Sequence, residues 1–210
     1  ALASLSAIKT YAPPVTDLLG QHVVGVRRHG KFLDLTTDGG LHLVWHLSRA
    51  GWVQWRDEVL TTPVKPGKGP LALRVSFVSD DGEPTGRLDI TEAGTQKRLA
   101  IYVVTDPSDV PGIARLGPDA MGDELSLPAF AGILAAAGRA QIKGVLRDQS
   151  IIAGIGNAYS DESLHAARMS PFKPCSSLSP EEVSALYSCM RSTLTTAIDN
   201  SVGHGTGTLK

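Results

Sequence analysis

The sequence predicts an α+β protein in which an antiparallel β-sandwich is followed by a helical domain. Short runs of β-branched, leucine and aromatic residues, separated by turn residues, fill the first part of the chain. From about residue 128 the pattern changes to alanine- and leucine-rich segments with helix-start signals. Three prolines lie between the two patterns, within residues 106–123. We therefore predict two domains, at residues 1–118 and 119–210.

The β part consists of short strand-like runs at regular spacing, which is typical of a sandwich or barrel. The turn Asp38-Gly39-Gly40 between two runs is a hairpin signal, because aspartate and glycine tolerate the backbone angles of tight turns. The predicted strands are residues 22–26, 32–36, 41–47, 51–55, 71–78, 86–90 and 99–104.

The second part contains four helical segments, one of which belongs to the stretch at residues 141–172 described below. Residues 127–139 are rich in alanine and leucine, and a shorter helix follows from residue 141. The last helix begins at a clear signal and runs to about residue 200. Ser179 is a good N-cap, Pro180 suits the first helical position, and Glu182 completes a capping box.

The composition indicates a soluble globular protein. The chain has 210 residues, of which 42% are hydrophobic, so it can bury a core. No apolar run approaches the length of a membrane span, and we expect no membrane association. Two cysteines, Cys175 and Cys189, are too few for a disulfide framework or a four-ligand zinc site. We expect a cytoplasmic protein without a metal or other cofactor.

The charge is segregated along the chain. The net charge of −1 argues mildly against a nucleic-acid binder, but the distribution of charge matters more than its sum. Residues 27–74 hold eight basic and four acidic residues, and residues 139–173 hold five basic and three acidic ones, so both segments are positive. A protein that binds DNA with one face requires such segregation.

The most informative stretch is residues 141–172, in which a short helix, a glycine-punctuated double turn and a second helix follow one another. Gly154 and Gly156 supply turn geometries with positive φ that other residues resist. Asn157 is a good N-cap type, and a helix N-terminus presents unpaired N–H groups to an anion such as phosphate. The glycine pair is not a nucleotide-binding loop, because no strand precedes it.

This stretch resembles the helix–two-turn–helix of the formamidopyrimidine-DNA glycosylase and endonuclease VIII family. In that family the pattern Gly-x-Gly-Asn-x-Tyr-x-x-Glu grips the backbone of a damaged DNA strand. The resemblance implies DNA contacts for the residues that match this pattern and for the lysine before it. They are Lys143, Gly154, Gly156, Asn157, Tyr159 and Glu162. Glu162, rather than the neighbouring Asp161, is expected to face the site.

The resemblance continues through most of the chain. Residues 27–33 look like the family's basic turn, in which a lysine at the position of Lys31 contacts phosphate next to the lesion. Residues 43–51 look like the strand and loop that insert a side chain into the duplex, with Arg49 where the family often has methionine. Residues 116–119 resemble the family's junction between domains. Residues 91–98 take the place of the loop that faces the opposite base, but do not match it.

Two family features are not found in the sequence, which begins at Ala1 and stops at Lys210. Family catalysis depends on an N-terminal Pro-Glu, whose proline amine attacks the lesion sugar. The family also carries a C-terminal Cys-x-x-Cys zinc finger. We therefore expect no catalytic residue and no zinc in this chain, and a sandwich without its first helix and strand.

Three functions stay open. The first is a DNA glycosylase and abasic-site lyase of base excision repair, represented without its ends. The second is a catalytically inactive protein that binds abasic sites or duplex DNA. The third is a helix–two-turn–helix used elsewhere, as in a ribosomal protein or topoisomerase subunit, against which residues 27–51 argue. The expected partner is double-stranded DNA, damaged or abasic, bound by a monomer near the nucleoid.

Overall fold

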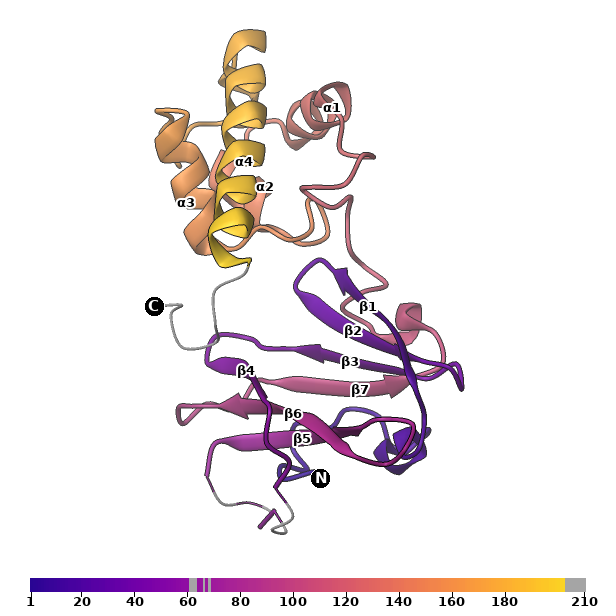
Figure 1. Cartoon of the computed structure of the whole chain (residues 1–210). Helices are drawn as coiled ribbons and strands as arrows, with labels where there is room; N and C mark the ends of the chain where they lie inside the picture. Colours follow the sequence, from indigo (N-terminus) through magenta and orange to yellow (C-terminus); the bar gives the residue numbers. More distant parts are fainter. Residues whose placement is uncertain (61–63, 66, 68, 203–210) are drawn as a thin grey trace. The chain divides into compact units, whose positions relative to one another are not determined.

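A computed structural model describes residues 1–60, 64, 65, 67 and 69–202 of the chain (Figure 1). These residues form two compact units. The first unit comprises residues 1–28 and 32–110, and the second comprises residues 29–31 and the chain from Pro111 onward. The predicted domain boundary at residue 118 lies a little further along the chain than Pro111.

Within the described residues, the strands of the first unit form two antiparallel sheets. One sheet has the order β1-β2-β3-β7 and the other the order β4-β6-β5. Short 3-10 helices lie at Val15–Leu18 (η1) and Pro107–Asp109 (η2). The strands are β1 (Val23–His29), β2 (Phe32–Thr37), β3 (His42–His46), β4 (Gly51–Arg56), β5 (Leu71–Val78), β6 (Pro84–Glu92) and β7 (Ala100–Val104).

The two sheets share one hydrophobic core, which confirms the predicted sandwich. Side chains alternate between the faces of a strand, so Leu43 and Trp45 of β3 point to the same side. They are buried in one cluster with Ile101 of β7, and with Leu73 and Ile90 of the other sheet. Burying these faces against each other removes their apolar surface from water and stabilises the unit.

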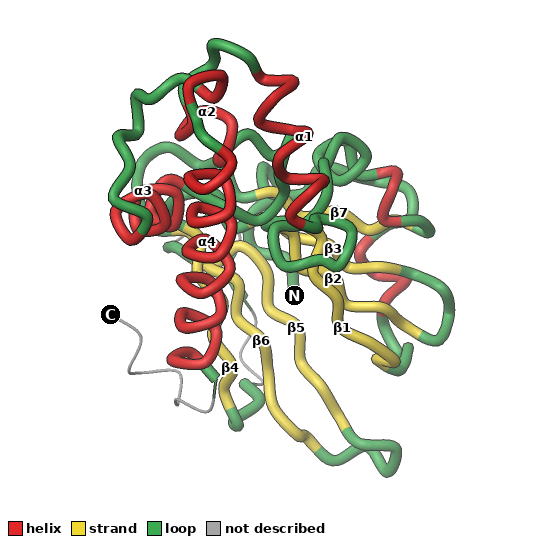
Figure 2. The backbone as a smooth tube through the Cα atoms, turned by 90° about the horizontal axis from the view of Figure 1, so that it is seen from above, coloured by secondary structure: helices red, strands yellow, loops and turns green. Residues whose placement is uncertain are grey.

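The second unit is helical, as the sequence predicts. Its core includes Phe130, Leu134, Leu146, Ile155 and Leu186, which are all fully buried. The α3 helix packs beside the long α4 helix (Figure 2). The helices are α1 (Leu127–Ala137), α2 (Ile142–Arg147), α3 (Asn157–Ala166) and α4 (Pro180–Ser201), with a 3-10 helix η3 at Cys175–Ser177.

Helix starts show one success and one error of the sequence interpretation. The α4 helix begins with the predicted capping box, since Ser179 and Glu182 each bond to the other's backbone. The prediction that Asn157 caps α3 is wrong. Gly156 is the N-cap, and Asn157 is the first helical residue. The Asn157 side chain is therefore directed to a different partner, described below.

Candidate nucleic-acid interface

The turn between α2 and α3 is built by its own side chains. The Gln149 carboxamide accepts a hydrogen bond from the Gly154 N–H at 3.1 Å and donates to the carbonyl oxygens of Ile155 at 2.7 Å and Arg147 at 2.9 Å. Gly154 has a φ of +99°, which a side chain would strain. The turn thus has a fixed shape before any ligand binds, and Gln149 is a supporting residue that the sequence analysis missed.

A second segment clamps this turn. The Gly117 N–H donates to the Gln149 carbonyl at 2.9 Å, and the Ala153 N–H donates to the Pro118 carbonyl at 2.9 Å. A Cβ atom on Gly117 would lie only 2.4 Å from the Ile151 carbonyl oxygen. Glycine is needed here because two backbones approach closely. The junction that the sequence singled out, residues 116–119, therefore supports the double turn.

The segment His29–Lys31 belongs to the same unit and places a lysine beside the turn. Gly30 has a φ of +55°, and a Cβ atom there would lie 3.1 Å from the Leu116 side chain. The next residue, Lys31, lies against Gly156, where an added Cβ atom would be 3.3 Å from Lys31 Nζ. Gly156 itself has an ordinary φ of −111°. The predicted positive φ is wrong for Gly156, whose lack of a side chain instead makes room for the lysine.

Two cations and an amide meet at the start of α3. Arg147, the last residue of α2, donates from Nη1 to Asn157 Oδ1 at 2.9 Å. This bond ties the two helices together across the turn and holds the guanidinium in place. Burial by neighbouring groups, and secondly the charge of Arg147, lower the pKa of the Lys31 ammonium. Arg147 is one of the five basic residues counted in residues 139–173, but it was not predicted as a DNA contact, although a basic residue just before the motif was a usable signal.

Two other predicted residues, Lys143 of α2 and Glu162 of α3, have different surroundings. Lys143 of α2 pairs with Asp161 at 2.7 Å, so an acid already compensates its charge. Glu162 is exposed on the helix surface. Asp161, rather than the predicted Glu162, therefore forms the ion pair with Lys143, a lysine that was predicted to contact DNA.

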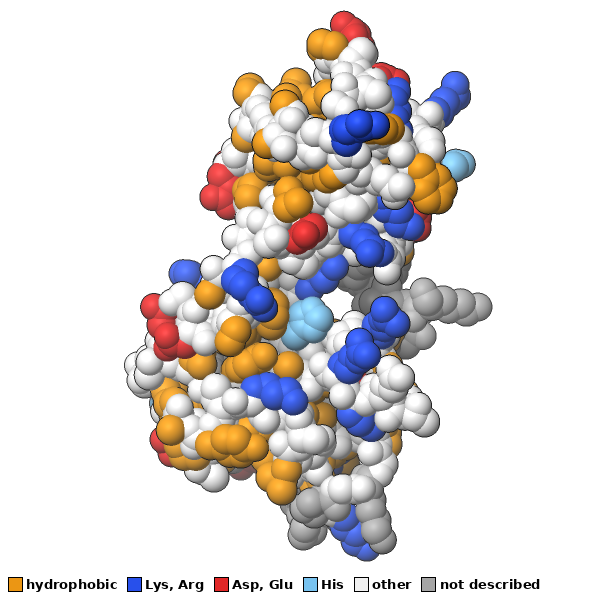
Figure 3. All heavy atoms as spheres, turned by 180° about the vertical axis from the view of Figure 1, so that it is seen from behind, with side chains coloured by type: hydrophobic (Ala, Val, Ile, Leu, Met, Phe, Trp, Pro, Cys, Tyr) orange, Lys and Arg blue, Asp and Glu red, His pale blue; other side chains and the backbone are white. Residues whose placement is uncertain are grey.

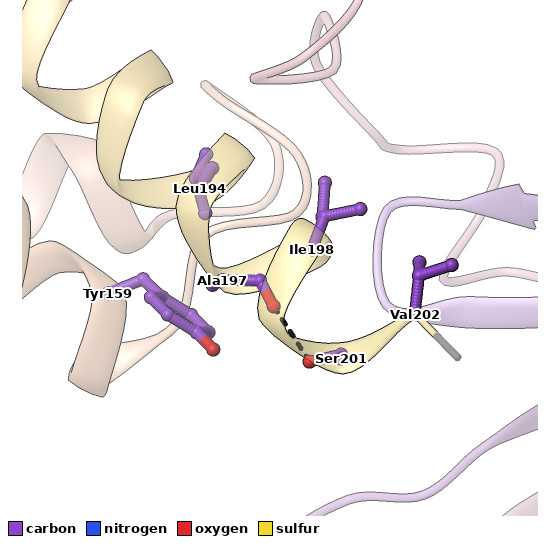
Figure 4. Close-up of a pocket in the computed structure, with 6 residues that line it drawn as sticks. All are labelled: Tyr159, Leu194, Ala197, Ile198, Ser201 and Val202. Carbon is purple, nitrogen blue, oxygen red and sulfur yellow. Dashed lines mark hydrogen bonds between the residues drawn. The ribbon is translucent and has the colours of Figure 1, made fainter. Parts of the chain in front are cut away.

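Tyr159 lines an apolar surface pocket of about 290 Å³. Its ring projects from α3 toward the last turns of α4, as Figure 4 shows. The other lining residues are Leu194, Ala197, Ile198, Ser201 and Val202. Tyr159 thus lines this surface hollow together with residues of α4, and the residue is 37% exposed.

Arg49 lies in the first unit, in the turn between β3 and β4. The turn is tight, since Ser48 has a φ of +57°. Arg49 lines a cavity of about 170 Å³ together with Gln96 and Arg98. The buried Glu92 carboxylate accepts hydrogen bonds from the N–H groups of Arg98 at 2.7 Å and Leu99 at 2.9 Å, which orders this loop. The structure thus brings together two segments that the sequence analysis treated separately.

The surface charge, the metal-binding side chains and the apolar helices of the described residues bear on what the chain could bind. On the face drawn in Figure 3, lysine and arginine side chains occur on the surface of both units. No group of three His, Cys, Asp or Glu side chains in the described part of the chain has a spacing that would hold a metal ion. Within the same residues, no helix combines the length and apolar character that a membrane crossing requires.

An antiparallel sandwich followed by helices with a clamped, cation-lined double turn defines a helix–two-turn–helix protein. Comparison with known families agrees. Residues 6–95 match the formamidopyrimidine-DNA glycosylase N-terminal domain, and residues 116–208 match the formamidopyrimidine-DNA glycosylase H2TH domain. The chain belongs to the formamidopyrimidine-DNA glycosylase and endonuclease VIII family.

Individual relatives show the extent of the similarity. The chain is 33% identical over 181 residues to a formamidopyrimidine-DNA glycosylase of Thermus thermophilus, covering 86% of this chain and 61% of that protein. An uncharacterized formamidopyrimidine-DNA glycosylase-like protein of Mycobacterium tuberculosis is 47% identical over 95 residues, covering 45% of this chain and 58% of that protein. The chain thus spans about three fifths of the length of these relatives.

Solved structures support the fold. The crystal structure of the MutM (Fpg) protein from Thermus thermophilus is similar with a TM-score of 0.71 and 29% identity, over 92% of this chain and 65% of that one. The Lactococcus lactis enzyme, solved non-covalently bound to DNA containing an abasic site, has a TM-score of 0.80. It is 22% identical over 99% of this chain and 74% of that one, so it supports the fold alone.

Proposed function

We propose that this chain recognises damaged duplex DNA in base excision repair, and that the double turn of the second unit binds the DNA backbone. The observation that supports this most is the convergence of Lys31, Arg147 and Asn157 at the start of α3. The first N–H groups of a helix lack partners within the helix and attract anions. A phosphate at this position would gain those donors, a fixed guanidinium and an ammonium.

The proposed contacts differ in strength. Arg147 is fixed by Asn157, so binding a phosphate costs it little side-chain entropy. Lys143 would have to give up its exposed ion pair with Asp161, which is worth about 0–1 kcal/mol. We therefore propose Arg147 and Lys31 as the principal cations, with Lys143 in a lesser role. All these donors come from the protein, so the proposed binding requires no metal ion.

We also propose that the chain removes damaged bases from DNA, which is the glycosylase activity that the names of the relatives state. Removal of the damaged base leaves an abasic site, and a lyase then cleaves the strand beside it. A chain that binds abasic DNA without changing it would instead match the second function left open above. Incubation of the chain with a duplex that carries one oxidised guanine, followed by denaturing electrophoresis, distinguishes the two, because only the enzyme yields a shortened strand.

The binding proposal is tested with fluorescein-labelled duplexes, one with an abasic site and one intact, by fluorescence anisotropy. Arg147→Ala removes charge-assisted hydrogen bonds worth about 1.5–3 kcal/mol, so we expect at least about tenfold weaker binding. Arg139→Ala is the matched control, because Arg139 is an exposed arginine of the same unit that precedes α2 in the chain. Equal affinities of the two variants would refute the proposed site.

A further inference from the structure

We propose that Gln149 is a positioning residue for DNA binding, and that it acts through the two N–H bonds of its side-chain amide rather than through its oxygen. This inference rests on the proposed function, because it concerns how the double turn presents the Arg147 guanidinium to a phosphate. Gln149 itself does not have to touch DNA. It fixes the two chain segments whose side chains meet at the start of α3.

The amide nitrogen of Gln149 joins the two sides of the double turn. Gln149 Nε2 donates to the carbonyl oxygen of Arg147, the last residue of α2, at 2.9 Å. It also donates to the carbonyl oxygen of Ile155 at 2.7 Å, two residues before α3 begins at Asn157. A carboxamide has two such donors, and both are used here. A single nitrogen therefore holds the end of α2 next to the segment that enters α3.

The neighbouring contacts of the turn hold a different part of it. The Asp148 carboxylate accepts hydrogen bonds from the Ser150 N–H at 3.0 Å and from the Ser150 hydroxyl at 2.7 Å. The Pro118 carbonyl accepts from the Ala153 N–H. These contacts shape residues 150–153, whereas the Gln149 side chain reaches residues 154 and 155. The spacing between the end of α2 and the start of α3 thus depends on Gln149.

This spacing fixes the guanidinium that the proposed function uses. The bond of 2.9 Å between Arg147 Nη1 and Asn157 Oδ1 requires that the backbones of the two residues lie at a suitable separation. A long side chain loses rotamer freedom when a ligand orders it, and that loss weakens binding. Because Gln149 holds both backbone segments, Arg147 is ordered before DNA arrives. The loss of freedom then belongs to folding and does not reduce the affinity for DNA.

The same two hydrogen bonds favour an anion electrostatically. Carbonyl oxygens carry a partial negative charge and repel a phosphate. The carbonyls of Arg147 and Ile155 lie on either side of the proposed phosphate site in the chain, and each is paired with an N–H of Gln149. Removal of these donors would leave two carbonyl oxygens without this partner. The donors of Gln149 should therefore matter more for DNA binding than its acceptor.

Two substitutions separate the donors from the acceptor. Gln149→Met removes all three hydrogen bonds of the side chain at a similar length, whereas Gln149→Glu keeps an acceptor for the Gly154 N–H and removes both donors. Gln141→Met and Gln141→Glu are the matched controls, because Gln141 is exposed in the same unit and its side chain forms no capping bond to α2. By fluorescence anisotropy on the abasic duplex, we expect both Gln149 variants to bind at least about fivefold more weakly, and both controls to stay within about twofold.

Two further readouts distinguish positioning of Arg147 from a general loss of structure. In an Arg147→Ala background, Gln149→Met should weaken binding by no more than about twofold, because the group that it positions is gone. The slope of log affinity against log salt should also fall by about one in Gln149→Met, as in Arg147→Ala, since each variant loses one phosphate contact. A residue with a merely structural role would change neither the coupling nor the slope in this way.

Each contrary result is distinct. Gln149 variants that bind like their controls, while Arg147→Ala binds weakly, overturn this inference and leave the proposed function intact. Equal losses from Gln149→Met with and without Arg147 also overturn it. Equal affinities of Arg147→Ala and Arg139→Ala overturn the proposed function, and this inference with it. Circular dichroism checks the fold of each variant, and if Gln149→Met is unfolded, Gln149→Glu decides, because it retains the bond from the Gly154 N–H.

Discussion

Substituting Gly156 by alanine tests whether this glycine is needed to make room for Lys31 rather than to allow an unusual backbone conformation. The new Cβ atom would lie 3.3 Å from Lys31 Nζ and 3.6 Å from Cε, so the end of the lysine side chain has to move. The φ of −111° is accessible to alanine, and the flexible lysine yields easily. Alanine is a poorer N-cap than glycine, but it also restricts the unfolded chain. We expect the free energy of unfolding to change by less than about 1 kcal/mol.

DNA binding should respond more strongly than stability. Displacement of the ammonium weakens one charged contact, worth about 1–1.5 kcal/mol, and so lowers the affinity for abasic duplex about tenfold. Anisotropy titration gives the affinity, and urea denaturation gives the stability. The control is Gly144→Ala, because a Cβ atom there meets nothing within 4 Å. Two results would contradict this role of Gly156: DNA binding by Gly156→Ala equal to that of the control, or a loss of more than about 2 kcal/mol of stability.

Three further predictions concern the contact of Gly117 with the turn, the ion pair between Lys143 and Asp161, and the pKa of His22. Gly117→Ala should cost about 1–3 kcal/mol in urea denaturation, because its Cβ would meet a backbone carbonyl oxygen at 2.4 Å; unchanged stability would contradict the clamp. Asp161→Asn should free Lys143 and strengthen DNA binding several-fold at low salt, whereas weaker binding would show that the carboxylate aids the site. The hydrogen bond that His22 donates to the Asp38 carboxylate raises the pKa of His22. The stabilisation is therefore complete below about pH 6.5 and is lost as pH rises through the raised pKa, and Tm measured across pH should lose this component in His22→Gln.

The fold was largely predictable, because the signals for it are local. Leu43 and Trp45 alternate along β3 and mark the face that enters the core cluster, and the capping box at Ser179 defines the start of α4. The strand order was not predictable, since hydrogen bonding between β3 and β7 joins segments far apart in sequence. The double turn was predicted from the resemblance to a family, because composition alone does not identify such a turn.

The candidate site was predictable only in part, because its contacts cross the turn. Asn157 stood out as a helix-start residue, but its side chain binds Arg147 ten positions earlier rather than capping α3. The role of Gly156 depends on Lys31, more than a hundred residues away in the chain. Such pairings arise from packing, and a pattern of residue types at fixed spacing does not contain them.

The central claim is that DNA binds at the turn between α2 and α3 with Lys31 beside it. Two-dimensional NMR of the ¹⁵N-labelled chain, titrated with a short duplex that carries one abasic site, tests this most directly. The account predicts that the largest amide shifts occur at residues 29–31 and 147–157, and that they diminish as salt is added. Shifts centred on other residues, with the amides of the turn unmoved, would contradict it.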